Sequence, residues 1–260
     1  MSSEYWLAHG AHATPDDGRC AMEWVSYLAG EPHNDQPACV SPALRAFCVS
    51  LNDNLAGERR QRLRPYLTRT IGTAQDGLDG ARGWMAADWL IRVYTPAWLE
   101  LAGAGEAARQ LALLAPLREA SDLPRSLDAL MQARRDARAA LKHVLRASRV
   151  ARLVPSATGR WARKAAWASG EAAVWTVARV GVGGVVGEQV RDDATAAAGD
   201  AAAAAARAAA AQTGGGGRRD AARAALAPTV RALERSSVAL LDRMLPTQPL
   251  SELPRVIVPA

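Results

Sequence analysis

Apolar side chains recur at steps of three and four residues along most of this chain. Between 44 and 55 the recurring set is Leu44, Phe47, Leu51 and Leu55. Positions three and four apart share one side of an α-helix, so this spacing predicts helices that each bury one face. The helix formers Ala, Leu and Arg dominate the composition, and β-forming residues are scarce outside short Val clusters. We therefore predict an all-α fold: a multi-helix orthogonal or array-like bundle with a flexible Ala/Gly-rich C-terminal region.

Capping residues and helix breakers predict where these helices begin and end. The first helix is expected to begin near Asp16–Asp17 and to end at Gly30. Ser41-Pro42 combines a hydroxyl cap with proline at the first helical position, and Thr95-Pro96 repeats that signal. Pro65 either bends a third helix or marks a later start. The other expected helices span about 57–71, 76–94, 105–115, 121–150 and 218–244.

Composition divides the chain into four expected parts. Residues 1–120 are predicted to form a compact helical domain, and 121–182 a long basic helix followed by a Trp-bearing helix. Residues 183–217 are rich in Gly and Ala and end in four consecutive glycines. That composition predicts a flexible joint. Residues 218–260 are expected to form a C-terminal helix with a Pro-rich tail.

Positive charge is concentrated in one segment of the chain. The formal net charge is +6, yet residues 131–180 hold eleven basic side chains and two acidic ones. Steps of three and four residues put five of them on one face of a single helix: Arg135, Arg138, Lys142, Arg146 and Arg149. Such a face is a candidate surface for a nucleic-acid backbone or an acidic protein partner. The alternative is an ordinary solvated helix face.

Histidine and cysteine cluster near the start of the chain, where they are a candidate metal site. The ligand-type residues are His9, His12, Cys20, His33 and Cys39. Zinc sites usually contain close ligand pairs, and the only tight pair here is His9 with His12. The alternative is small buried thiols and a loop histidine held by capping. We predict no cofactor.

The loop 31–39 is a candidate catalytic site because it carries Glu31, His33, Asp35 and Cys39. A carboxylate, an imidazole and a second carboxylate within five residues are suited to general acid–base chemistry, since His titrates near neutral pH. Cys39 becomes a nucleophile only with a base nearby and a lowered pKa. Asn, Asp and Pro are also the ordinary residues of a tight turn, which is the structural alternative.

Several classes of protein are disfavoured by missing signals. Three cysteines cannot all pair within one chain, and residues 1–12 lack the basic start and apolar run of a secretory signal. The longest apolar stretch, 172–186, is interrupted by Arg179 and by glycines, so no membrane span is expected. We expect a cytoplasmic protein. The glycine cluster 181–187 matches neither dinucleotide-binding nor P-loop spacing.

The sequence 23–53, followed by 82–103, resembles a group of Ala-rich helical proteins of actinobacteria. The motif is an E-P-x-x-D-x-P-x-C-x-x-P loop, followed by a helix that closes at 51–53 in Leu-Asn-Asp. Here the loop residues are Glu31, Pro32, Asp35, Pro37, Cys39 and Pro42. The resemblance covers about the first 120 residues and implies a bacterial origin and a helical fold, with no known activity.

These features favour a non-catalytic helical interaction protein that binds another macromolecule, in an immunity-like or assembly role. Its expected partner is another protein or a second copy of itself. One alternative is a metal-dependent or acid–base enzyme centred on loop 31–39. A second alternative is nucleic-acid binding through the basic helix face 135–149.

Overall fold

The computed structural model describes residues 6–55, 57–150, 162–171, 173 and 217–246. Within these ranges every regular element is helical and no strand occurs, which confirms the all-α prediction. A further helical stretch covers 162–171. Residues 183–216, predicted to be flexible, lie outside the described residues. In chain order the named helices are α1 (Ala21–Ala29), α2 (Pro42–Asn54), α3 (Gly57–Arg60), α4 (Arg64–Thr70), α5 (Asp79–Trp89), α6 (Thr95–Ala102), α7 (Gly105–Ala112), α8 (Leu123–Val150) and α11 (Gly217–Met244).

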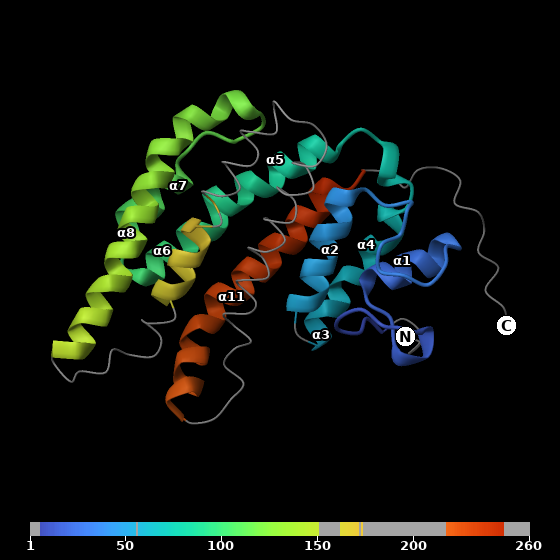
Figure 1. Cartoon of the computed structure of the whole chain (residues 1–260), viewed down its shortest axis with the longest axis horizontal. Helices are drawn as coiled ribbons and strands as arrows, with labels where there is room; N and C mark the ends of the chain where they lie inside the picture. The colour runs from blue at the N-terminus through green and yellow to red at the C-terminus, as the bar shows by residue number, and fades with distance from the viewer. Residues whose placement is uncertain (1–5, 56, 151–161, 172, 174–216, 247–260) are drawn as a thin grey trace.

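The C-terminal helix α11 lies in the middle of the molecule (Figure 1). It packs against α2 and α5, although about 170 residues separate it from α2 in the sequence. On one side of it α1 packs against α2 and α4. On the other side α6 packs on α7 and α7 on α8, which places α8 at an outer edge of the molecule (Figure 1).

The hydrophobic core is a single cluster of buried side chains, whose members range from Leu7 to Leu245 in the sequence. It contains the predicted stripe of α2, because Leu44 and Phe47 are fully buried and Leu51 and Leu55 are 3% exposed. Three further large members are Trp89 at the end of α5, Tyr94 in the turn that follows it, and Trp98 in α6. Burying side chains of this size stabilises the fold by about 1.5–3 kcal/mol each. The predicted division into a domain at 1–120 and later parts stays a prediction.

The first helix begins later than the sequence predicts. Asp16–Asp17 belong to a short 3₁₀ turn, Pro15–Asp17, and α1 begins at Ala21. Gly18 has φ +124°, a non-helical conformation that favours glycine and that separates the turn from the helix. Cys20 is the N-cap, and its side chain and that of Glu23 accept each other's backbone N–H in a capping box. The predicted end is confirmed, since Gly30 adopts the left-handed conformation after Ala29.

A helix, α6, begins at Thr95-Pro96 as predicted, but Thr95 does not cap it. Thr95 has helical backbone angles, and a π-helical turn, Leu90–Tyr94, joins α5 to α6 without a break. Pro96 has no backbone N–H and would leave one carbonyl of a regular α-helix without a donor. The π turn before it has a different hydrogen-bond pattern, which accommodates the proline. Pro65 lies in the first turn of α4, which a 3₁₀ turn, Gln61–Leu63, joins to α3.

The predicted helices near 105, 121 and 218 are confirmed. A 3₁₀ turn, Ala120–Asp122, precedes α8, and the Asp122 carboxylate accepts the backbone N–H groups of Arg118 and Glu119. None of the helices in the described ranges combines the length and apolar character that crossing a bilayer requires.

Candidate functional site

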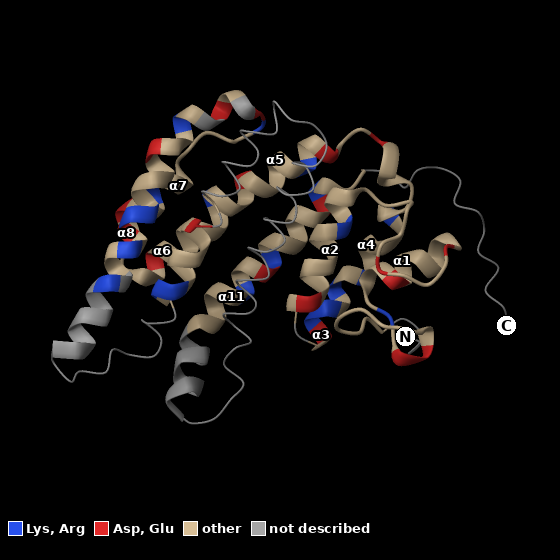
Figure 2. Ribbon diagram, in the orientation of Figure 1, with Lys and Arg blue, Asp and Glu red and all other residues tan. Residues whose placement is uncertain are grey.

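Helix α8 carries the predicted basic face at the outer edge of the molecule (Figure 2). Arg135, Arg138 and Lys142 are exposed on it, and we call these three residues the basic face. Arg146 and Arg149 also belong to α8, but their side chains lie outside the described part. The structure therefore brings the predicted cations together on one helix.

The basic face is supported from behind by the stretch 162–171. Arg134 forms an ion pair with Glu171, and its Nη2 donates to Glu171 Oε2 at 3.0 Å. The helices approach closely, since a Cβ built on Gly170 would lie 3.7 Å from the Cα of Arg134. The Arg138 guanidinium lies 5.8 Å from the centre of the Trp167 ring. These contacts fix the orientation of α8 and leave Arg135 and Lys142 exposed at its surface.

In loop 31–39 the structure joins Glu31 to Cys39. The Glu31 carboxylate accepts the backbone N–H groups of Ala38 at 2.7 Å and Cys39 at 2.9 Å. Burial raises the pKa of Glu31, but the hydrogen bonds from Cys39 and Ala38 outweigh burial and lower the pKa below its usual value. Burial and the neighbouring Glu31 charge raise the pKa of Cys39 to about 11. The Cys39 thiol is therefore protonated at neutral pH, and Glu31 is engaged in closing the loop.

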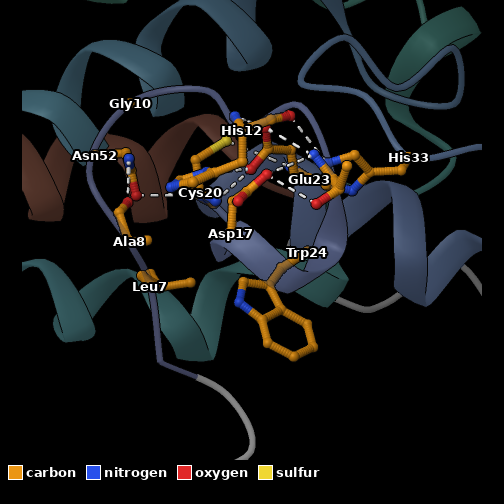
Figure 3. A network of polar contacts seen from close by, with 12 residues as sticks. Leu7, Ala8, Gly10, His12, Asp17, Cys20, Glu23, Trp24, His33 and Asn52 are labelled. Carbon is orange, nitrogen blue, oxygen red and sulfur yellow. Dashed lines mark hydrogen bonds and ion pairs between the residues drawn. The ribbon is translucent and has the colours of Figure 1, made fainter.

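His33 lies beside a buried carboxylate, Glu23 (Figure 3). Its Nε2 lies 3.9 Å from Glu23 Oε1 and 3.1 Å from the carbonyl oxygen of His12. His12 Nδ1 lies 2.8 Å from Glu23 Oε2. Asp35, the remaining candidate of the loop, belongs to neither group among the described contacts. Glu31, His33 and Asp35 thus do not form one acid–base cluster.

Glu23 is the centre of a polar cluster that the sequence reasoning missed. It is 1% exposed and accepts the backbone N–H groups of His12 at 2.6 Å and Cys20 at 2.7 Å. Burial raises the pKa of Glu23, but these two N–H groups and the His12 ring outweigh burial, so the pKa is lowered. The three-residue spacing of a cap residue and Glu, Cys20-x-x-Glu23, is the signal from which this carboxylate was predictable.

The candidate metal ligands are divided between these groups. His12, Cys20 and His33 surround Glu23, Cys39 pairs with Glu31, and His9 is exposed on the surface. Among the described residues, no three or more His, Cys, Asp and Glu side chains are arranged to hold a metal ion. Burial raises the pKa of Cys20 to about 12, which keeps its thiol protonated. The absence of a cofactor stays a prediction.

Comparison with family models, with curated proteins and with solved structures finds no match to this chain.

Proposed function

We propose that this chain is a non-catalytic helical interaction protein that binds an acidic protein partner through the basic face of α8. The observation that supports this proposal is the set of three exposed cations, Arg135, Arg138 and Lys142, aligned on one side of an outer helix. Over seven residues this line is about 10 Å long, which fits a complementary row of carboxylates on a partner helix.

The residues before the basic face favour a protein partner. Leu127, 43% exposed, and the half-buried Met131 precede Arg135 at steps of four residues, so they extend the same side of α8. An apolar patch beside arginines is typical of protein interfaces, where Met and Arg are enriched. A nucleic-acid backbone would use the cations but would leave the exposed Leu127 without an apolar partner.

Nucleic acid is the second candidate because an aromatic ring lies beside the basic face. Trp167 is half-buried under Arg138, and an arginine held over an indole ring is a geometry that also stacks on bases. Loop 31–39 supports an enzymatic role less well, since Glu31 is engaged by two backbone N–H groups and the Cys39 thiol is protonated. We also propose a cytoplasmic location, supported by the three free thiols.

Charge reversal on α8 tests the proposal. The triple variant Arg135→Glu, Arg138→Glu and Lys142→Glu should lower the affinity for fluorescein-labelled poly-L-glutamate at least tenfold, measured by anisotropy at low and physiological salt. Three lost surface pairs at roughly 0.5 kcal/mol each already account for about a tenfold change. The same measurement with short duplex DNA tests the second candidate, which predicts tighter binding to DNA than to poly-glutamate.

A matched control separates this surface from net charge. Arg118, Arg235 and Arg243 are exposed on other parts of the molecule, and reversing all three produces the same change of charge. The control variant should keep most of the affinity of the unaltered chain. Equal losses from both triple variants would show a general charge effect and would remove the assignment to α8.

A further inference from the structure

Residues 6–12, which we call the docked segment, are held by side chains from other parts of the molecule. The Gln61 side chain pairs with Leu7 at two points: Oε1 accepts the Leu7 N–H at 2.9 Å, and Nε2 donates to the Leu7 carbonyl at 3.0 Å. This is the contact that a neighbouring strand would make with an extended peptide. Gln61 follows α3, more than 50 residues from Leu7 in the sequence.

Three more side chains bind successive backbone groups of the docked segment. Asn52 Nδ2 donates to the Ala8 carbonyl at 2.9 Å, and Asp53 Oδ1 accepts the Gly10 N–H at 3.0 Å. Glu23 accepts the His12 N–H at 2.6 Å (Figure 3). The docking surface thus includes polar side chains from α1, α2 and the turn after α3: Glu23, Asn52, Asp53 and Gln61. Side-chain nitrogens of Trp24, Arg60 and His33 also lie within hydrogen-bond distance of backbone oxygens of the segment.

One apolar anchor accompanies these backbone contacts. Leu7 is fully buried, whereas Trp6 is 55% exposed and the side chains of His9 and Ala11 are also exposed. Gly10 has φ +77°, which favours glycine at that position. A series of bonds to the backbone with one buried side chain is how protein surfaces bind peptides in general: the backbone supplies affinity and the anchor supplies selectivity.

The docked segment is connected to α1 by a linker, residues 13–20, of which Arg19 accepts the Ala8 N–H through its carbonyl oxygen at 2.8 Å. Residues 13–17 are exposed, and the side-chain hydrogen bond of Thr14 is made to Asp17 within the linker itself. The contacts of Gln61, Asn52 and Asp53 with the segment do not depend on this connection. An identical segment supplied by another molecule would make the same contacts, which is the condition for exchange between copies.

We propose that the docking surface binds residues 6–12 of a second copy of this chain, so that two copies associate by exchanging their docked segments. The occupant is chosen because this segment is the one whose anchor, glycine and backbone spacing the structure shows to fit. With a single buried anchor the segment opens at a cost well below global unfolding, which allows exchange between folded molecules. This surface is separate from α8, so the proposal does not depend on the proposed function.

Two complementary full-length variants test the exchange. Leu7→Asp gives a chain with a defective segment and an intact docking surface. Gln61→Met with Asp53→Ala gives a chain with an intact segment and a defective docking surface, at two half-buried positions. Each variant alone should remain monomeric, while an equimolar mixture should form a heterodimer that native mass spectrometry detects. A mixture that contains only monomers would overturn the proposal.

The control replaces an apolar residue that plays no part in docking. Leu113, 83% exposed, is changed to Asp, and that variant is mixed with the same docking-defective chain. Its own segment competes for the docking surface, so this mixture should contain much less heterodimer than the mixture with Leu7→Asp. Equal amounts of heterodimer in the two mixtures would count against exchange, because they would show association through another surface.

A labelled synthetic peptide of residues 6–13 provides a second measurement. It should bind the Leu7→Asp chain at least tenfold more tightly than the unaltered chain, whose own segment competes for the surface. Leu7→Ala replaces Leu7→Asp if the charged variant loses its helical circular dichroism. Equal affinity for the opened and unaltered chains would contradict the proposed competition.

Discussion

A buried carboxylate destabilises a fold unless donors surround it, and Glu23 satisfies this condition. Two backbone N–H groups and the ring of His12 contact its two oxygens. One of these donors caps the start of α1, and the others belong to the docked segment. A single side chain thus fixes the beginning of a helix and the course of the chain that precedes it.

Glu23→Gln should lower the free energy of unfolding by about 1–3 kcal/mol at pH 7, because the amide nitrogen that replaces one carboxylate oxygen cannot accept an N–H. The lowered pKa of Glu23 means that its contribution is present at neutral pH and is lost as the pH falls through the folded-state pKa, below 4.5. The difference between variant and unaltered chain should therefore shrink in acid, as measured by urea titration at several pH values. Glu106→Gln, on an exposed side chain whose pair with Arg109 is screened by solvent, should show much smaller effects.

At the scale of elements, the sequence predicts helix faces better than helix junctions. The stripe Leu44, Phe47, Leu51 and Leu55 is buried as its spacing indicates, and Ser41-Pro42 begins α2 as predicted. Thr95-Pro96 likewise places a hydroxyl residue before proline but lies inside a continuous helix. Capping is a local preference, and the burial of Tyr94 and Trp98 on either side of Thr95 overrides it.

Phe47→Ala should lower the free energy of unfolding by about 3–5 kcal/mol, because the ring is fully buried and its removal leaves a cavity. Chemical denaturation followed by circular dichroism measures this change. Leu113→Ala is the matched surface substitution and should stay within about 0.5 kcal/mol. A small effect at position 47 would mean that α2 is not packed into the core as the structure shows.

At the scale of the whole molecule, Arg82 connects α5 to the C-terminal end of the described chain. It is 1% exposed, forms a two-point pair with Asp76, and its Nε donates to the Met244 carbonyl at 3.0 Å. The last turn of α11 is thereby attached to α5 and to the loop before it. The composition of 76–94 suggests an amphipathic helix, but it does not indicate which distant carbonyl Arg82 will reach.

Arg82→Ala should destabilise the fold by about 3–5 kcal/mol, since Asp76 and the Met244 carbonyl both lose their donor. Arg82→Lys should restore only part of the loss, because an ammonium group cannot form the two-point pair. Hydrogen exchange should accelerate in the last turn of α11. Arg109→Ala, which removes an exposed and solvent-screened ion pair with Glu106, should change the stability far less.

The candidate sites were predictable to different degrees for a physical reason. The basic face follows from spacing within one helix, so Arg135, Arg138 and Lys142 could be placed together from the sequence alone. Glu23 and Gln61 act on segments brought near by packing, and no local pattern encodes that meeting. His33 was assigned to its own loop, whereas tertiary contacts direct it to His12 and Glu23. Such long-range partners can be predicted only once the fold is known.

The π turn Leu90–Tyr94 has a geometric consequence for everything that follows it. Each residue of an α-helix advances about 100° around the axis, and a π turn holds one residue more than an α turn. Side chains after it are therefore rotated by about that angle from where an uninterrupted helix would aim them. Trp98 and Leu99 face the interior with this rotation in place. Without the extra residue of this turn, the indole of Trp98 would point in a different direction around the helix axis.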